Sequence, residues 1–477
     1  MENTIKVSSE VGTLKRLLIH SPDSGLGKVV PSKAQDWLFE DIIHLDTMRK
    51  HEYDYYLKTL LYFLDPDKIK GRLAEIDQDE SRDFFKPESP DYFKSDKVIE
   101  VQRLLAEVLE NTINRTRLVA AVCAVEHCSF TVQSELLAYP SSELAKTLIS
   151  GMTPDKQMLF APIPNFIFTR DIGITINDHL LLNKPAKLAR TREALLMQYV
   201  FFHHEIFSEL KNKIIEIPDN EHHFLMPDEQ QSNSQATLEG GDVMMVAPNH
   251  LLIGISERTT VFAAKQVIKI LFEKKLVDKV TLVKIPKKRD YMHIDTVFTQ
   301  VKRNIWVLLG SLGKRAKQED EVFIKAGLIK PKASEELKII QFRRESKEPR
   351  TIEYLEDLLT EISVNDLGCM PLEVQFVYSG NNEFPYGDRE QWTDSCNLLA
   401  LKEGVVIGYD RNDKTLDAFK QIGFEAIKVA DLLQDFESGK SSPVMLQNTF
   451  ILLPSAELSR ARGGSHCMSM PILREDF

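Results

Sequence analysis

The chain has 477 residues, of which 43% are hydrophobic and 27% charged, and its formal net charge is −11. This composition is typical of a globular protein, and the acidic balance argues against a general nucleic-acid or anionic-membrane binder, whose surface would be basic. No stretch approaches the roughly 20 apolar residues of a membrane helix, and residues 1–20 lack the apolar core of a secretory leader. We therefore expect a cytoplasmic protein with no nucleic-acid or membrane partner.

The five cysteines do not indicate a disulfide framework, and no Cys-x-x-Cys pair suggests a structural zinc site. Cys123 and Cys128 fall in an apolar run, which favours burial in a helix core. Cys467 follows Gly463-Gly464. Taken alone, it is compatible with a buried hydrophobe, a metal ligand, half of a disulfide or a nucleophile.

The first third of the chain contains charged and helical segments. Residues 64–95 are highly charged and interrupted by prolines, which is typical of a surface elaboration. Residues 100–152 have apolar residues at helical spacing and lack strand signals. We expect a helical insertion there.

From Phe168 onward, one structural pattern repeats with little identity between copies. Copies that begin at Phe168, Leu238 and Trp392 each hold two β-rich runs joined by a polar turn, followed by a run with helical spacing. A copy from Met292 has at least the hairpin. The expected buried face of one helical run comprises Val261, Ala264, Ile268 and Leu271.

Reactive side chains gather at the start of the first strand of each copy. They are Arg170, Asp171, Glu239, Asp242, His293, Asp295 and Asp394, and Cys467 opens the last segment. If similar units pack around a common axis, these strand starts converge. The sequence then predicts one crowded, polar pocket built from distant residues.

The residue types in this pocket suggest a chemistry. A cysteine attacks as the thiolate, and His293 is able to act as its acid or base partner. Several carboxylates beside a thiolate make sense if the substrate is a cation, because paired carboxylates grip a planar guanidinium. Arg190 and Arg258 follow second strands and are placed to bind a carboxylate at the other end of the substrate. Arginine carries both groups.

Several motifs in order resemble the arginine deiminases of the guanidino-group-modifying, or pentein, superfamily. They are "PNFIFTRD" (164–171), "LEGGDV" (238–243), "HIDTVFT" (293–299), "GVVIGYDRN" (404–412) and "RARGGSHCM" (460–468). The resemblance covers most of the chain. It implies a single catalytic α/β domain over 1–477, a five-bladed α/β propeller of pseudo-symmetric ββαβ units with the helical insertion at 100–152.

The resemblance also implies a role for each matching residue. Cys467 aligns with the nucleophile, His293 with the general acid/base and Glu239 with its carboxylate partner. Asp171 and Asp295 align with the pair that binds the guanidinium. The expected substrate-binding residues, among which Asp242 is as consistent with bracing the Gly240-Gly241 turn, are Asn165, Arg190, Asp242, Arg258 and Arg462.

The implied reaction is hydrolysis of free L-arginine to L-citrulline and ammonia through a covalent S-alkylthiouronium on Cys467, with no metal and no organic cofactor. Arginine dihydrolase activity, amidino transfer and action on another guanidino compound are alternatives. A non-catalytic binding protein on the same fold is a remote alternative, since fold does not fix function. A homo-oligomer is expected.

The sequence also departs from the family pattern. Surface insertions are expected at 64–95, 312–342 and 430–452, and the last of these precedes the loop that carries Arg462 and Cys467. Ser395-Cys396 stands where the family usually has Gly-Asn. This change could reshape the wall of the pocket.

Overall fold

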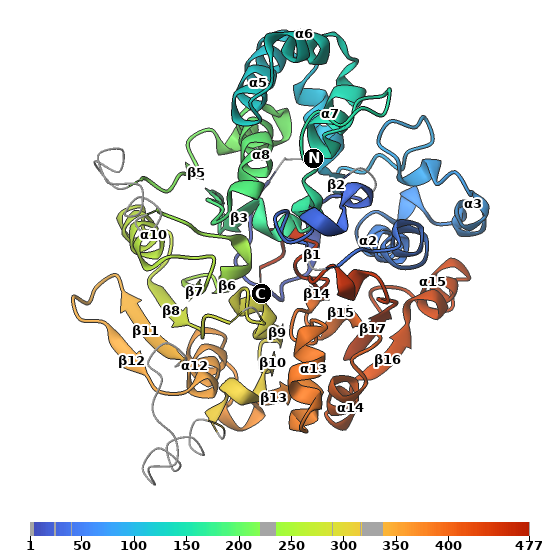
Figure 1. The fold of residues 1–477 in the computed structure, drawn as a ribbon. Helices are drawn as coiled ribbons and strands as arrows, with labels where there is room; N and C mark the ends of the chain where they lie inside the picture. The colour runs from blue at the N-terminus through green and yellow to red at the C-terminus, as the bar shows by residue number, and fades with distance from the viewer. Residues whose placement is uncertain are drawn as a thin grey trace.

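The computed structural model of the chain describes residues 4–22, 25–39, 41–219, 235–288, 290–314, 316 and 337–476. Within these residues the strands form five separate sheets, which surround a common centre with helices on their outer sides (Figure 1). The fold is therefore α/β. In the described part of the chain, none of the helices has the length and apolar character needed to cross a membrane.

The strands of the first three sheets, in chain order within each sheet, have the following bounds. One sheet contains β1 (Leu14–Ile19), β2 (Val98–Glu100) and β18 (Met470–Arg474). The next contains β3 (Gly173–Ile176), β4 (His179–Leu182) and β5 (Ile214–Ile215). The third contains β6 (Val243–Ala247), β7 (His250–Ile255), β8 (Lys279–Lys284), β11 (Lys338–Arg343) and β12 (Arg350–Ile352).

The other two sheets follow in the chain. One contains β9 (Phe298–Lys302), β10 (Ile305–Leu308) and β13 (Gln375–Tyr378). The last contains β14 (Leu399–Lys402), β15 (Val405–Tyr409), β16 (Glu425–Lys428) and β17 (Thr449–Leu453).

All five sheets share one pairing pattern. An antiparallel pair is followed by a parallel neighbour: β3–β4 then β5, β6–β7 then β8, β9–β10 then β13, β14–β15 then β17, and β18–β1 then β2. A parallel neighbour requires a crossover connection, which explains the helices on the outside. In the sheet of β1, β2 and β18, the two strands of the antiparallel pair come from opposite ends of the described chain, β1 from the start and β18 from the end.

The helices of the crossover connections are α8 (Thr191–His203), α10 (Val261–Glu273), α12 (Leu355–Glu361), α14 (Asp413–Gln421) and α15 (Val429–Glu437). The helix α13 (Tyr386–Trp392) connects β13 of one sheet to β14 of the next. Between β1 and β2 the chain forms α1 (Leu45–Thr47), α2 (Asp54–Leu64) and α3 (Leu73–Gln78). Residues 100–152 contain α4 (Val101–Val108), α5 (Thr112–Val125), α6 (Phe130–Ala138) and α7 (Ser141–Ser150).

The polar turns expected between the paired strands are present at Asn177-Asp178, Pro248-Asn249 and Gly404, and Asn177 and Gly404 adopt the positive φ that such turns use. The buried face of α10 differs from the expected stripe in one residue. Val261 is 47% exposed because it is the first residue of the helix, and Ala263 and Val267 pack inward instead.

Two segments expected on the surface contribute to the core. In 64–95, Ile69, Phe84 and Phe93 are buried. In 430–452, α15 buries its apolar face and β17 lies between β15 and β16. The expectation that these two segments lie only on the surface was wrong. Both contain many polar residues, but their apolar residues are spaced so that they pack into the core. Most of 312–342 lies outside the described residues.

The inner position of β17 gives a test of this packing. Replacing Ile451, which is 0% exposed, with alanine should lower the free energy of unfolding by about 2–5 kcal/mol, because a buried aliphatic side chain leaves a cavity. Denaturant-induced unfolding measures the change. Val444, 85% exposed in the same segment, is the matched control, and its alanine variant should stay within about 0.5 kcal/mol of wild type. Equal effects at the two positions would contradict the assignment of β17 to the core.

Candidate active site

Short 3-10 turns deliver acidic side chains to the centre of the molecule. The turns Thr169–Asp171, Gly240–Asp242 and Ile294–Thr296 immediately precede or adjoin β3, β6 and β9, the inner edge strands of three sheets (Figure 1). Each turn contributes one buried aspartate: Asp171, Asp242 and Asp295. The convergence expected from the repeated pattern thus has a local cause, a tight turn at the entrance to each inner strand.

Glycine lets one of these turns approach the imidazole of His293. A Cβ at Gly241 would lie 2.5 Å from His293 Nδ1, closer than any side chain could tolerate. The Gly241 amide also donates a hydrogen bond of 2.9 Å to Asp171 Oδ1. The turn therefore connects two of the predicted site residues through its backbone.

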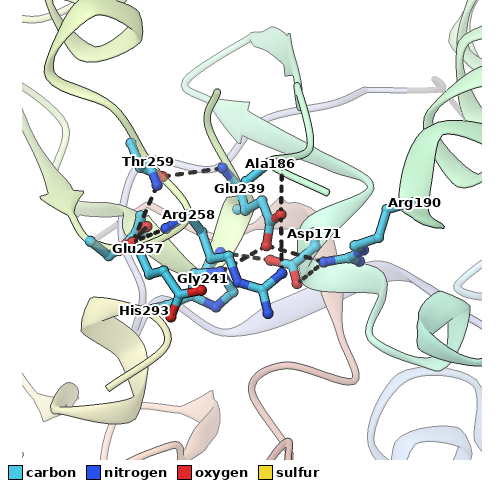
Figure 2. A network of polar contacts seen from close by, with 12 residues as sticks. Asp171, Ala186, Arg190, Glu239, Gly241, Glu257, Arg258, Thr259 and His293 are labelled. Atoms are coloured by element: carbon cyan, nitrogen blue, oxygen red, sulfur yellow. Dashed lines mark hydrogen bonds and ion pairs between the residues drawn. The ribbon is translucent and has the colours of Figure 1, made fainter. Parts of the chain in front are cut away.

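His293 and Glu239 form a buried pair. His293 Nε2 lies 3.0 Å from Glu239 Oε2 (Figure 2). Burial opposes the charge on His293, but Asp171, Glu239 and Asp242 outweigh it and raise the pKa of His293 to about 10. Burial acts against the charge on Glu239 as well, and Arg190, His293 and Arg258 hold its pKa well below the usual range. The pair is an imidazolium and a carboxylate.

Arg190 points at two carboxylates, as Figure 2 shows. Its Nη1 lies 2.8 Å from Asp171 Oδ2 and 3.2 Å from Glu239 Oε2, and its Nε donates to Glu193 Oε2 at 2.8 Å. Arg190 was expected to bind the carboxylate of a ligand, yet most of its donors are engaged with protein acids. Of its nitrogens, Nη2 has no hydrogen-bond partner among the described residues.

Asp242 braces the neighbouring turn. It accepts hydrogen bonds from the Ser256 hydroxyl at 2.6 Å and from the Ile294 amide at 3.1 Å, so both carboxyl oxygens are engaged with protein groups. Burial raises the pKa of Asp242 to about 6, although His293 and Ser256 oppose the shift. Of the two interpretations left open by the sequence, these contacts favour the brace over contact with a substrate.

Cys467 lies beside Asp295 in the interior. Its Sγ is 3.6 Å from Asp295 Oδ2, its amide donates to Asn397 Oδ1 at 3.0 Å, and its carbonyl accepts from the Arg170 amide at 3.0 Å. Burial, followed by the charges of Asp295 and Asp171, raises the pKa of the Cys467 thiol well above its ordinary value. In this structure the group is therefore a protonated thiol.

Asp295 is held by a residue that the sequence reasoning did not select. His466 Nδ1 lies 2.9 Å from Asp295 Oδ2, and His466 Nε2 lies 3.1 Å from Glu10 Oε2. Glu10 in turn accepts from Arg170 Nη2 at 2.8 Å. The other oxygen of Asp295, Oδ1, is buried and has no hydrogen-bond partner in the part of the chain that the structure describes.

Asn397 joins the loop that carries Cys467 to the turn that carries Asp295. Its Oδ1 accepts from the Cys467 amide, and its Nδ2 donates to the Asp295 carbonyl at 3.2 Å. The two residues before it pack inward. Ser395 bonds to Ser379 at 2.7 Å, and burial raises the pKa of the Cys396 thiol to about 12. Ser395-Cys396 thus supports the wall behind the site.

The remaining expected residues surround this centre. Arg258 Nη1 lies 3.7 Å from Glu239 Oε1, and Arg462 stacks on Trp392 with its guanidinium carbon 3.5 Å from the ring centroid. Asn165 Nδ2 donates to the Trp37 carbonyl at 2.8 Å. Arg258 Nε and the Nε and Nη1 atoms of Arg462 are buried and find no partner within the described ranges.

Three of these groups have a spacing that a metal ion could use. One ligand atom each from Asp171, Glu239 and His293 lies within 4.8 Å of the others. However, Arg190 and Arg258 already supply positive charge to the two carboxylates. A divalent cation would meet buried guanidinium groups at close range, so this cluster does not suit a metal.

The site residues that sequence reasoning missed are Glu10, Glu193, Asn397 and His466. Two of them stood beside residues that were selected, since His466 precedes Cys467 and Asn397 follows Ser395-Cys396. A surface cavity of about 460 Å³, lined in part by His250, Arg343 and Asp366, shares no described residue with this site.

The raised pKa of His293 predicts a pH-dependent contribution to stability. Its folded pKa of about 10 exceeds the ordinary value of 6.5, so the contribution is complete below pH 6.5 and is lost as the pH rises through 10. The difference in unfolding free energy between wild type and His293→Asn should shrink by up to about 1.4 kcal/mol per pH unit between pH 7 and 9. The Val444→Ala variant serves as a control with a constant difference, and a constant difference for His293→Asn would contradict the assignment.

The sequence comparisons with known proteins agree on one family. A sequence model described as arginine deiminase matches residues 94–474. The arginine deiminase of Borrelia garinii subsp. bavariensis is 28% identical over 477 residues, covering 100% of this chain and 99% of the relative, and that of Listeria innocua is 28% identical with 99% of each covered.

Among solved structures, the amidinotransferase SxtG of Microseira wollei is 13% identical with a TM-score of 0.46, covering 99% of this chain and 98% of that one. The DDAH of Pseudomonas aeruginosa in complex with citrulline is 15% identical with a TM-score of 0.36, covering 64% and 76%. The sequence match over most of the chain, together with the buried cysteine, histidine and paired carboxylates described above, establishes that this chain belongs to the arginine deiminase family.

Proposed function

We propose that this protein hydrolyses the guanidinium group of free L-arginine to give L-citrulline and ammonia, with Cys467 as the nucleophile. One observation carries the proposal. Cys467 Sγ lies 3.6 Å from Asp295, whose second carboxylate oxygen is buried without a hydrogen-bond partner in the described chain. A buried, ionised oxygen beside a thiol suits a cationic ligand whose electrophilic carbon reaches the sulfur.

Substrate binding and activation of the thiol are coupled in this arrangement. The carboxylates of Asp295 and Asp171 raise the pKa of Cys467, in addition to burial. A guanidinium bound between them neutralises their effect and favours the thiolate. The nucleophile is therefore generated when a cation of the right shape is present, which protects the resting enzyme from unspecific thiol chemistry.

When the cation binds, the Cys467 thiol releases its proton to solvent, and in the first half of the reaction the thiolate Sγ forms a bond with the guanidinium carbon. The resulting tetrahedral adduct breaks one C–N bond, the His293 imidazolium donates its proton to the departing nitrogen, and ammonia leaves. An S-alkylthiouronium remains on the sulfur. Glu239 stabilises the imidazolium before the transfer and orients the ring at Nε2.

The second half consumes water. The neutral His293 takes a proton from a water molecule, and the oxygen adds to the same carbon. The C–S bond then breaks, citrulline is released, and the sulfur leaves as a thiolate that is reprotonated. The acid of the first half is thus the base of the second, a cycle that the neighbouring carboxylates support by favouring the protonated ring.

The buried arginines are proposed to bind the amino-acid end of the substrate. Arg258 and Arg462 keep guanidinium nitrogens that no described residue satisfies, and Arg190 keeps Nη2. Donors of this kind suit a carboxylate, which accepts in the same plane. Arg462 adopts a positive φ of 61° and lies against Trp392, so a shift of this side chain on substrate entry is part of the proposal. Asn165 is proposed to contact the same end.

We read the five sheets as the blades of a five-bladed α/β propeller within one catalytic domain. The shared pairing pattern and the pairing of β1 with β18 support this interpretation, because together they make each sheet equivalent and close the ring. A cytoplasmic location and a homo-oligomeric state complete the proposal, both on the grounds of composition and family.

Removing the thiol should abolish turnover. Cys467→Ala is expected to reduce the release of citrulline and ammonia from arginine by about 10³-fold or more, because no other described group replaces the sulfur beside Asp295. Cys123→Ala, at a buried cysteine in α5, is the matched control and should retain activity. Quantifying ammonia, citrulline and ornithine together decides the reaction: ornithine from wild type would indicate a dihydrolase, and an active Cys467→Ala would remove the thiol from the mechanism.

Arg258 should determine the preference for a substrate with a carboxylate. Arg258→Gln is expected to lower kcat/KM for arginine about tenfold or more, since a hydrogen bond to a charged group contributes about 1.5–3 kcal/mol. Activity on agmatine, which lacks the carboxylate, should change less. Arg411→Gln is the control, because Arg411 holds the corresponding place in its own repeat and donates to Ser459. An equal loss on both substrates would show that Arg258 acts on the guanidinium end.

A further inference from the structure

His466 bridges two carboxylates in the interior. Its Nδ1 lies 2.9 Å from Asp295 Oδ2 and its Nε2 lies 3.1 Å from Glu10 Oε2. His466, Asp295 and Glu10 are all more than nine-tenths buried. The residue immediately after His466 is Cys467, whose Sγ approaches the same Asp295 oxygen.

The hydrogen-bond geometry fixes the protonation state. An ionised carboxylate only accepts hydrogen bonds, and a neutral imidazole has a single N–H to donate. Both ring nitrogens of His466 face a carboxylate oxygen, so both must carry a proton if Asp295 and Glu10 are ionised. A protonated His466 is the imidazolium cation.

Both carboxylates are held in the ionised form. Arg170 Nη2 lies 2.8 Å from Glu10 Oε1, and Arg170 and His466 outweigh burial and hold the pKa of Glu10 well below its usual range. Burial also opposes the charge on Asp295, but His466 lowers the pKa of that carboxyl. Near Asp295 the other charged or titratable groups are His293, Asp394 and the Cys467 thiol. Arg474 lies near Glu10.

The Glu10 segment is itself rigidly placed. Arg474 Nη1 donates to the Gly12 carbonyl at 2.7 Å and to the Ala400 carbonyl at 2.8 Å, which ties the segment to two sheets. A Cβ at Gly12 would lie 2.2 Å from the Glu475 carbonyl oxygen, so the backbones are in close contact there. Glu10 therefore presents a fixed negative charge to His466.

We infer that His466 is a positioning residue, an imidazolium hydrogen-bonded to both Glu10 and Asp295, that orients Asp295 and offsets its charge beside the Cys467 sulfur. The inference rests on the function proposed above and adds to it. By engaging one Asp295 oxygen, the imidazolium directs the other, Oδ1, which no described residue satisfies, toward a ligand. Its positive charge also lessens the repulsion between Asp295 and a thiolate.

The test removes the charge of Glu10 and keeps its shape. In Glu10→Gln, His466 has one anionic partner in place of two, so the imidazolium loses one of the two negative charges that stabilise it. We expect kcat/KM for arginine to fall about tenfold at neutral pH. The ratio of variant to wild-type kcat/KM should decrease further as the pH rises, because the imidazolium is the active form.

Glu100→Gln is the matched control. Glu100 forms an equivalent buried pair with His20, 2.7 Å from Nδ1, at the end of β2 and outside the site. It should lose a similar amount of stability while its activity ratio to wild type stays constant with pH. A Glu10→Gln variant whose pH profile matches that of Glu100→Gln would overturn the inference.

A second readout does not depend on turnover. Nitrogen-15 NMR of histidine-labelled wild type, with His466→Asn to assign the signal, should show both ring nitrogens of His466 protonated from pH 6 to pH 8. An unprotonated ring nitrogen at pH 7 would overturn the inference even in a fully active enzyme. If wild type fails to hydrolyse arginine, the proposed function falls, and the NMR signal still decides the charge of His466.

Discussion

Ionised carboxylates packed into the centre of the molecule constrain the structure around them. Removing a carboxylate from water costs several kcal/mol unless a cation and hydrogen bonds replace the solvent. Glu10, Asp171 and Glu239 each have an arginine within about hydrogen-bond distance, from Arg170 or Arg190. Glu10, Asp171 and Glu239 precede strands of three different sheets, whereas Arg170 and Arg190 both lie in the segment around β3 and β4. The sheets therefore have to be held in place around the centre for the charges to be satisfied.

Two other buried acids, of which Asp394 has Arg462 nearby, behave differently. Burial raises the pKa of Asp242 to about 6 and that of Asp394 to about 7, and Asp295 adds to the shift at Asp394. The centre therefore holds two kinds of carboxyl group, one ion-paired and ionised and one close to neutral. Contact with an arginine does not decide this alone, since burial raises the pKa of Glu193 although Arg190 Nε lies 2.8 Å from its carboxylate.

Much of the site follows from the sequence because its residues occupy equivalent places in a repeated unit. Asp171, Asp295 and His293 each stand at the entrance to an inner strand, and Cys467 precedes β18 in the same way. A residue at that place faces the centre in each sheet, so the repeat alone predicts the convergence. Glu10 does not occupy such a place. It precedes β1, which is the second strand of the antiparallel pair with β18 although it comes first in the chain.

The contacts that individual side chains and segments make in the folded protein were harder to predict. Arg190 looked like a ligand for a substrate carboxylate, but its contacts with Asp171 and Glu193 depend on side-chain directions that sequence spacing does not specify. The segment 430–452 was expected on the surface as an extra segment relative to the family, but it is rich in apolar residues, and the contiguous run Thr449–Leu453 forms β17 inside a sheet. In both cases the contacts depend on three-dimensional proximity that sequence spacing does not specify.

The Asp295 Oδ1 atom, which has no hydrogen-bond partner among the described residues, also bears on the release of the product. Citrulline carries a neutral urea where arginine carries a charge, so once the reaction is over the product no longer offers a counter-ion to Asp295 or Asp171. In the proposed mechanism the positive charge persists on the S-alkylthiouronium and is lost only when water replaces the sulfur. The loss of this charge removes the attraction between the reacted group and the two carboxylates, which favours release of the product.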